Sequence, residues 1–558
     1  MASIASTSGI LSQSETRKVI VASSVGAIIE YYDFFLYGSL ASIIAKQFFS
    51  GLDPTSAFIF ALLAFAAGFI VRPLGAVVFG RLGDMIGRKY TFMITLLLIG
   101  FSTFVAGLLP SFASVGMAAP TILIVLRLVQ GLALGGEYGG AATYVAEHSP
   151  AHRRGAHTAW VQTTATLGFL LSLAVILVVR SLMSNDAFEV WGWRIPFLVS
   201  LILLSISVYI RVSMKESPVF LHLKQSATVS KAPVREAFGE WKNLRVVLIC
   251  LFGLCAGQSI VWYTSQFYAL FFLTQILKVD TTYASLLFAT ALVLSMPLFI
   301  ACGALSDKIG RKWMIMFGIL IAALTYNPLF KALTHYANPA LERAQERSSI
   351  ILTANPGECS FQGNPVARDI DFRTSCDIAK RILAQSSASY TVESAQAGSV
   401  ASVKIGDRII GSVEGRRTID GEAFDSESKH HIERFRNDIK SAMKQAGYPV
   451  SADPAQINAT MVVLILLVFM IFVALTYGPL AALLVEMFPP RIRYTSMSLP
   501  YHIGAGWFGG LLPTISFALV AQHGNIYAGL VYPIAGAIMT VIIGSVFLKD
   551  TKASRAAA

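Results

Sequence analysis

The sequence predicts an all-α polytopic membrane protein with twelve transmembrane helices in two six-helix bundles and a small outward-facing insert domain. Three observations lead to this prediction. Hydrophobic residues make up 55% of the 558 residues and charged residues only 14%, whereas soluble domains carry about 25% charged residues. Many runs reach the roughly 20 apolar residues that a membrane-spanning helix needs. Finally, the two halves of the chain repeat the same loop motifs.

The first apolar run is too long for the hydrophobic region of a cleavable signal peptide, so we expect it to remain as helix 1. Basic residues gather in the short loops on the side of the two termini. By the positive-inside rule, both termini lie in the cytoplasm, at a bacterial-type inner membrane. The expected helices span residues 19–45, 57–80, 91–110, 119–146, 157–181, 194–212, 244–275, 283–304, 314–333, 459–485, 496–521 and 525–548.

Two loop sequences repeat along the chain. "GRLGDMIGRK" (80–89) and "GALSDKIGRK" (303–312) share the pattern G-x-x-x-D-x-x-G-R-K, and each follows an even-numbered helix. A looser pair follows the next even-numbered helix of each half, where Glu147 and Glu486 each precede a proline and two basic residues. Internal repeats of this kind predict two homologous halves.

The repeats locate an insertion. Asp84 and Asp307 are 223 residues apart, whereas Glu147 and Glu486 are 339 apart. The polar stretch 334–458, between helices 9 and 10, accommodates the extra residues and carries 15 Lys/Arg and 16 Asp/Glu. Strand-like alternation in 388–415 and helical spacing in 426–447 favour a folded domain; a disordered linker is the alternative. In an oxidising outer compartment, its cysteines Cys359 and Cys376 are able to form a disulfide.

These observations divide the chain into five parts. The expected parts are an N-terminal six-helix bundle (1–213), a cytoplasmic central loop (214–243), a C-terminal six-helix bundle (244–333 and 459–548), the extracytoplasmic insert (334–458) and a cytoplasmic tail (549–558).

At the two repeated loops the chain resembles the major facilitator superfamily. The stretches "EYYDFFLYG" (30–38), "RLVQGLALGGEYGGAATYVAEHSPAHRRG" (127–155) and "WGWRIPFLVS" (191–200), followed by "ESPVF" (216–220), resemble its metabolite:proton symporter family. That family includes permeases for 2-oxoglutarate, citrate, shikimate and proline/betaine. Tyr31 stands where the family usually has tryptophan. The resemblance covers nearly everything outside 334–458.

Ionisable residues inside expected helices are candidates for proton coupling. A charge at the bilayer centre costs at least about 2.5–3.5 kcal/mol, so such residues normally face a wet cavity or a partner. The candidates are Glu30 and Asp33 in helix 1 and Arg127 and Glu137 in helix 4. In related facilitators an acid of helix 1 interacts with an arginine of helix 4, and the matching pair here is Asp33 with Arg127. The alternatives are a permanent structural ion pair and, for Glu30 and Glu137, a role in helix packing.

The repeated loops are candidates for gates at the cytoplasmic end. An aspartate at a helix end can accept from the N-terminus of a facing helix and pair with nearby arginines, holding one access state shut. The alternative is that the basic residues of these loops only set the orientation of the protein in the membrane. The candidate gate residues are Asp84, Arg88, Asp307, Arg311, Glu147 and Glu486.

Polar and aromatic residues within the helices are candidates for lining a substrate cavity, although such residues also join helices to one another. Arg127 offers a planar fork of donors suited to carboxylates. The candidates are Tyr32, Arg127, Gln130, Tyr138, Gln162, Gln258, Tyr263 and His502.

Together these features predict a secondary transporter that imports a small organic acid or zwitterion with a proton by alternating access. The expected partners are this substrate, protons and membrane lipid. Nucleic acid, metals and cofactors are not expected. A uniporter or antiporter of the same solutes is the first alternative, and a receptor whose insert senses ligand is the second. An enzyme would need a nucleophile–base pair or metal ligands within the helices, and the sequence shows neither.

Overall fold

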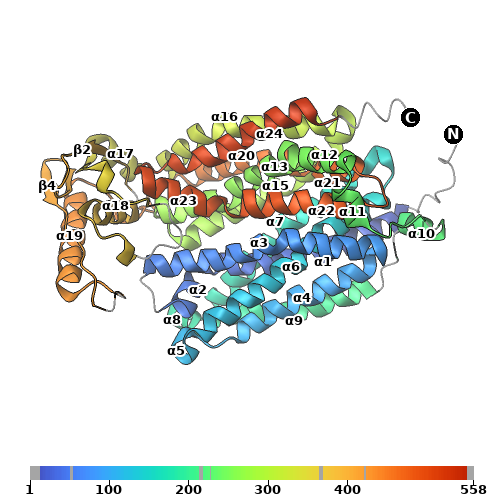
Figure 1. Ribbon diagram of the computed structural model, residues 1–558, viewed down its shortest axis with the longest axis horizontal. Coiled ribbons are helices and arrows are strands. Elements are labelled where there is room, and N and C mark those ends of the chain that lie inside the picture. The colour runs from blue at the N-terminus through green and yellow to red at the C-terminus, as the bar shows by residue number, and fades with distance from the viewer. Residues whose placement is uncertain are drawn as a thin grey trace.

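The computed structural model describes residues 13–50, 54–212, 216, 218–226, 228–362, 369–386, 388–419, 421 and 423–549. Two bundles of long helices lie side by side (Figure 1), the N-terminal one in blue to cyan and the C-terminal one in green to red. The N-terminal bundle consists of α1 (Gln13–Ser39), α2 (Ala41–Phe48), α3 (Pro54–Met85), α4 (Arg88–Leu108), α6 (Ala118–Glu147), α7 (Arg154–Ser181) and α9 (Arg194–Val212). Its loops hold α5 (Phe112–Val115), η1 (Ala151–Arg153), α8 (Asn185–Ala187) and η2 (Phe188–Gly192).

The C-terminal bundle has more breaks, including wide π-helical turns (η3, η4, η5 and η8), which often mark functional sites. Its first helix consists of α12 (Trp241–Cys250), η3 (Leu251–Cys255), α13 (Ala256–Tyr263), η4 (Thr264–Tyr268), α14 (Ala269–Phe271) and η5 (Phe272–Ile276). The others are α15 (Thr281–Ile309), α16 (Arg311–Ala337), α20 (Ala459–Tyr477), α21 (Leu480–Met487), α22 (Arg493–Ile503), η8 (Gly504–Gly510), α23 (Leu512–His523), η9 (Ala528–Leu530) and α24 (Val531–Phe547). Short helices α10 (Pro218–Gln225) and α11 (Pro233–Phe238) lie between the bundles in sequence.

Eleven helices within the described ranges are long and apolar enough to cross a membrane, and α1 with α2 makes a twelfth if the bent pair counts as one span. The pair bends by 61°. The break follows Gly38 and Ser39, a residue combination at which helices often kink. The all-α, twelve-helix fold predicted from the sequence is therefore confirmed.

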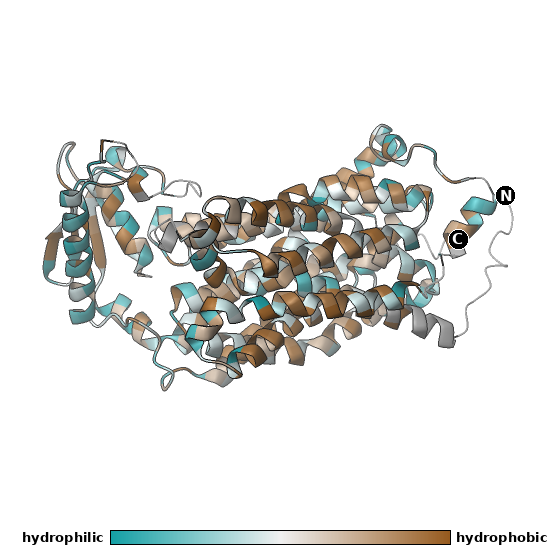
Figure 2. Ribbon diagram, turned by 90° about the horizontal axis from the view of Figure 1, so that it is seen from below, coloured by the Kyte–Doolittle hydropathy of each residue, from teal (hydrophilic) through white to brown (hydrophobic). Residues whose placement is uncertain are grey.

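Residues 339–458 contain a small α/β domain at one end of the bundles (Figure 1), and hydrophilic residues, in teal, are more frequent along its ribbon than along the bundles (Figure 2). Its four-stranded sheet has the order β2-β1-β3-β4, with β1 and β2 parallel and the other pairs antiparallel. The elements are α17 (Pro339–Arg347), β1 (Ile350–Ala354), η6 (Pro356–Glu358), η7 (Asp369–Asp371), α18 (Ser375–Gln385), β2 (Tyr390–Ser394), β3 (Ser402–Ile405), β4 (Arg408–Gly411) and α19 (Ser426–Gln445). The expected folded insert is thus present; that it faces outward remains a prediction.

The insert is anchored to the C-terminal bundle by backbone hydrogen bonds. The amide of Tyr390 donates to the carbonyl of Gly524 at 2.7 Å, and the amide of Ala452 donates to the carbonyl of Lys278 at 3.0 Å. The ring of Tyr390 packs directly on Gly524, where a Cβ would come within 2.5 Å of it. The insert therefore contacts the C-terminal bundle directly, through these residues.

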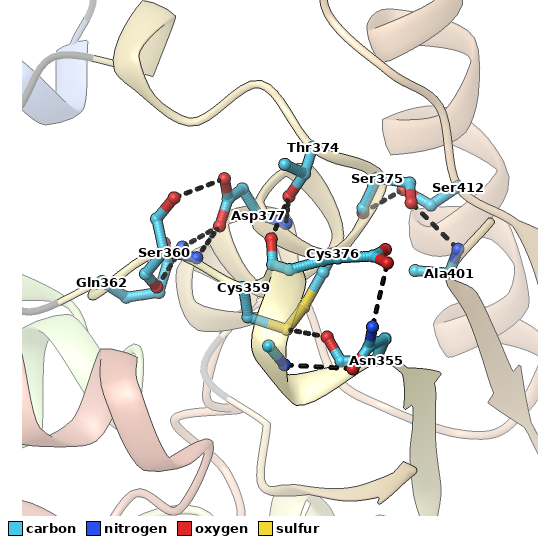
Figure 3. The surroundings of a disulfide bond; sticks show 12 residues. Asn355, Cys359, Ser360, Gln362, Thr374, Ser375, Cys376, Asp377, Ala401 and Ser412 are labelled. Carbon is cyan, nitrogen blue, oxygen red and sulfur yellow. Dashed lines mark hydrogen bonds between the residues drawn. A yellow bond between two sulfur atoms is a disulfide. The ribbon is translucent and has the colours of Figure 1, made fainter. Parts of the chain in front are cut away.

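Cys359 and Cys376 form a disulfide that joins the loop after β1 to the first turn of α18 (Figure 3). Beside it, the carboxylate of Asp377 accepts from the amide and the hydroxyl of Ser360 at 2.7 and 2.9 Å. The bond therefore secures a loop that reaches the bundle, because the amide of Gln362 donates to Gln522 at 2.7 Å.

Replacing both cysteines with serine is expected to destabilise the insert and to leave transport intact. The bond closes a loop with a sequence separation of 17, for which loop-closure entropy predicts a loss of about 3 kcal/mol. Protease sensitivity of the insert and solute uptake by the same preparation measure the two effects. Loss of uptake by a correctly inserted protein would show instead that the transport cycle depends on this disulfide.

Candidate functional site

At the end of the bundles opposite the insert, each repeated aspartate accepts from the first turn of a helix in the other bundle. Asp84 Oδ2 of α3 accepts from the amide and the hydroxyl of Thr495 in α22, at 2.9 and 2.8 Å. Asp307 of α15 accepts from the amides of Gly155 and Ala156 in α7, at 2.9 and 3.0 Å. Carboxylates at these positions satisfy the unpaired amides of a helix N-terminus.

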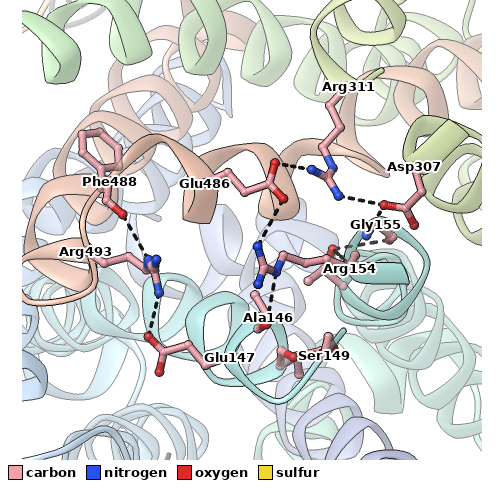
Figure 4. A network of polar contacts seen from close by, with 12 residues as sticks. Ala146, Glu147, Ser149, Arg154, Gly155, Asp307, Arg311, Glu486, Phe488 and Arg493 are labelled. Carbon is pink, nitrogen blue, oxygen red and sulfur yellow. Dashed lines mark hydrogen bonds and ion pairs between the residues drawn. The ribbon is translucent and has the colours of Figure 1, made fainter. Parts of the chain in front are cut away.

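Two glutamates add ion pairs between the bundles (Figure 4). Glu147 Oε1 accepts from Arg493 at 3.0 Å. Glu486 accepts from Arg154 at 3.2 Å and also from Arg311, which in turn donates to Asp307 at 2.7 Å. In each half an arginine follows the glutamate by seven residues, so the two pairs are related by the internal repeat.

We call these contacts the latch, formed by Asp84, Glu147, Arg154, Asp307, Arg311, Glu486, Arg493 and Thr495. The latch joins the bundles at one end, as expected for a gate in its closed state. The side chain of Arg88, the remaining candidate gate residue, lies outside the described residues.

A cavity lies between the bundles, further from the latch along α1 and α6. Aromatic rings from both bundles form much of its wall, among them Tyr31, Phe35, Tyr138, Trp262 and Tyr501. The rings of Tyr138 and Tyr501 stack across the two bundles at 3.6 Å between centroids.

Few charged side chains line this aromatic cavity. Arg72 lies 4.2 Å over the ring of Phe34 and 4.4 Å over that of Phe69, and Glu137 and His502 also reach the wall. Arg72 Nε, Glu137 Oε2 and both ring nitrogens of His502 are buried without a hydrogen-bond partner in the described part of the chain. Buried polar groups are normally satisfied, so these atoms are available to a bound solute.

Half of the eight substrate candidates line the cavity: Tyr138, Gln258, Tyr263 and His502. Gln162 lies behind the wall, where its amide donates to the Tyr138 hydroxyl and to the Tyr477 carbonyl, both at 2.9 Å. Tyr32 is outside the wall and donates to the carbonyl of Pro196 at 2.6 Å.

Arg127 and Gln130 are also away from the cavity wall. Arg127 Nη1 donates to Gln130 at 2.5 Å, and its guanidinium lies 4.5 Å over the ring of Tyr37. The expected ion pair between Arg127 and Asp33 is not formed among the described residues. Asp33 is 2% exposed and its Oδ1 has no partner there. The prediction of this contact is wrong for the conformation described, because Gln130 and three aromatic rings surround the guanidinium instead.

The acids Glu30 and Glu137 are paired with an arginine that the sequence reasoning missed. Arg211, in the last turn of α9, donates from Nη2 to Oε1 of Glu30 and, at 3.1 Å, to Oε1 of Glu137. Arg211 falls at the end of the expected helix 194–212 and was not among the candidate residues. Two carboxylates in neighbouring helices without an assigned cation were the signal that could have found it. Arg72 could also have been identified as a candidate from the sequence, because it is a charged residue inside the expected helix 57–80.

Comparisons with known proteins agree with this architecture. The family model described as "Sugar (and other) transporter" matches residues 18–232. The chain is 34% identical over 323 residues to a proline/betaine transporter of Salmonella typhimurium, covering 56% of this chain and 64% of that protein. It is 35% identical over 331 residues to the shikimate transporter of Escherichia coli, covering 58% and 74%.

Among solved structures, the proton:xylose symporter XylE of the major facilitator superfamily, bound to 6-bromo-6-deoxy-D-glucose, superposes with a TM-score of 0.60. The identity is 16%, and the alignment covers 96% of this chain and 97% of that one. The match therefore concerns the fold. The alignment to the Salmonella proline/betaine transporter spans slightly less than two thirds of that protein's length.

Proposed function

The chain belongs to the major facilitator superfamily of membrane transporters, and from this we propose that it is a proton-coupled symporter of a small zwitterion. By the proposal, substrate and proton enter together by alternating access at a bacterial-type inner membrane. The positive-inside rule places the latch on the cytoplasmic side and the insert outside.

The observation that carries the substrate proposal is the composition of the cavity wall. Arg72 provides a planar guanidinium suited to a carboxylate. The surrounding rings provide faces that attract a quaternary or secondary ammonium by cation–π interaction. A zwitterion such as glycine betaine or proline meets both features, whereas a dicarboxylate finds only one arginine on the wall. The relatives that are named for proline and betaine support this choice.

The latch supports alternating access. Its contacts lie at one end of the cavity and join the two bundles through side chains and helix ends that water can solvate once they separate. Breaking them allows the bundles to part at that end while helix packing within each bundle is kept. This is the rigid-body motion by which repeat-built transporters work.

Buried acids support proton coupling. Glu30 of α1 and Glu137 of α6 are both buried. Ionisable groups in the membrane interior are costly and typically mark proton or substrate pathways.

Uptake of labelled glycine betaine, proline and shikimate into proteoliposomes, with and without an imposed pH gradient, tests the proposal. A symporter of zwitterions accumulates glycine betaine or proline when the interior is alkaline and discriminates against shikimate, which is a carboxylate without an ammonium group. Equilibration that ignores the pH gradient would instead indicate a uniporter of the same solutes.

Replacing Arg72 with glutamine is expected to raise the KM for the transported zwitterion about tenfold or more. A hydrogen bond to a charged group contributes about 1.5–3 kcal/mol, and the variant loses the charge that meets the carboxylate. The matched control is Arg343→Gln, on the exposed face of the insert. An unchanged KM in the Arg72 variant would remove this residue from the binding site.

A further inference from the structure

The group formed by Glu30, Glu137 and Arg211, which we call the triad, joins three helices of the N-terminal bundle. One guanidinium nitrogen of Arg211 donates to both carboxylates. The three side chains are 1%, 3% and 5% exposed, in the order named. The triad is thus sealed from bulk water in the conformation described.

Among the described residues, no second cation forms an ion pair with either carboxylate of the triad. Arg211 also donates to the carbonyl of Phe92 at 3.4 Å and lies 4.6 Å over its ring. Asp33 of α1 and the Tyr494 hydroxyl of α22 are the other titratable groups that interact electrostatically with Glu30 or Arg211, and Tyr31 interacts with Glu137. Arg72 and His502 line the same cavity as Glu137. Within the described ranges, the ion pairs of both carboxylates are with Arg211 alone.

The charge count of the triad does not balance when both carboxylates are ionised. Oε2 of Glu30 and Oε2 of Glu137 are both buried without a partner in the described part of the chain. The two carboxyl groups lie close together, because both accept from the same nitrogen of Arg211. Two carboxylates this close cannot both stay ionised in an interior of low dielectric, and such pairs share a proton.

We propose that Glu30 and Glu137 share one exchangeable proton, that Arg211 holds the two carboxyl groups together, and that this triad is the coupling site of the transporter. This inference rests on the proposed function and names the residues at which the proton binds. It assigns the coupled proton to the triad and leaves Asp33, which has no contact with a cation among the described residues, without a part in coupling.

The position of Glu137 connects the proton to the substrate. Glu137 lines the cavity together with Arg72, whereas Glu30 lies behind it. When the proton is on Glu137, the carboxyl group no longer repels a substrate carboxylate beside Arg72 and donates a hydrogen bond to it. The proton thus raises the affinity for the substrate and, by reciprocity, the substrate raises the affinity for the proton. This is the sign of coupling that symport requires.

Glu30→Gln and Glu137→Gln test the proposal, because either change imitates the protonated triad and leaves one ion pair with Arg211. Both variants are expected to lose the accumulation of labelled glycine betaine or proline that a pH gradient drives. Glu30→Gln is expected to keep exchange of the same solute without a gradient, since Glu30 does not line the cavity. Glu189→Gln, in a half-exposed pair with Lys46, is the matched control. Gradient-driven accumulation by Glu30→Gln would overturn the proposal.

A substrate-free measurement separates this proposal from the proposed function. Infrared difference spectra of the purified protein, recorded across a pH titration, report the carbonyl stretch of a protonated carboxyl group. We expect a titrating band in the unmodified protein, in Asp33→Asn and in Glu189→Gln, and its loss in both triad variants. A band that persists in both triad variants, or that disappears in Asp33→Asn, would overturn the triad assignment. Failure of the unmodified protein to accumulate any solute would count against the symport proposal alone.

Discussion

Replacing Gly131 with alanine is expected to prevent the protein from folding, so that no folded protein is obtained on expression. Gly131 of α6 lies against Gly68 of α3, and a Cβ built on it would come within 1.9 Å of the Gly68 carbonyl oxygen and 2.6 Å of the Gly68 Cα. Both are backbone atoms, so no side chain can move aside. A Cβ on Gly75 or Gly135 would likewise come within 1.9 or 2.3 Å of a backbone oxygen along the same helix pair. Small residues let transmembrane helices approach in this way, and overpacking here costs about 3 kcal/mol or more.

The yield and the melting temperature of the detergent-solubilised protein measure this effect. Gly411→Ala is the matched control, because a Cβ at Gly411 meets no atom within 4 Å and the residue does not have a positive φ. A melting temperature of Gly131→Ala equal to that of the control would contradict the close approach of α3 and α6.

The helices could be predicted because each expected span is a long apolar run, and hydropathy reports burial in lipid directly. The bend after Ser39 was not predicted, although a glycine and a serine precede it. In the insert, β3, β4 and α19 follow local patterns. The pairing of β1 with β2 does not, because it joins residues 350–354 to residues 390–394 through α18. Local sequence therefore predicted elements there and not the sheet order.

The candidate site was predictable where two copies of a motif could be compared. Asp84 and Asp307 were expected to meet the N-terminus of a facing helix, and each does so. The partners of the buried charges were not predictable, because they depend on how helices rotate against one another. Arg127 points to Gln130 and a cluster of rings, whereas Arg211, at the edge of its span, reaches inward to Glu30. The sequence shows that a buried charge needs a partner, but it does not show which helix provides that partner.

Replacing Glu486 with glutamine is expected to open the latch. Glu486 is the acceptor shared by Arg154 of one bundle and Arg311 of the other. Glutamine carries no negative charge, so in the closed state the repulsion between the two guanidinium groups is offset less, although Arg311 keeps its pair with Asp307. In the open state water solvates both groups. Hydrogen bonds to charged groups contribute about 1.5–3 kcal/mol each, and a loss of about 2 kcal/mol raises the open population roughly thirtyfold.

Hydrogen–deuterium exchange of the latch amides measures the opening without added labels. The amides of Gly155, Ala156 and Thr495 donate to Asp307 and Asp84 only while the bundles are joined. Their exchange is therefore expected to accelerate together, in α7 and in α22, although the ion pairs of Glu486 are with Arg154 and Arg311. Glu236→Gln is the matched control at the same end, because it removes the pair with Arg491, whose side chain is 54% exposed, and such pairs contribute little. Faster exchange in α7 alone would show that the two halves of the latch open independently and would contradict a rigid-body gate.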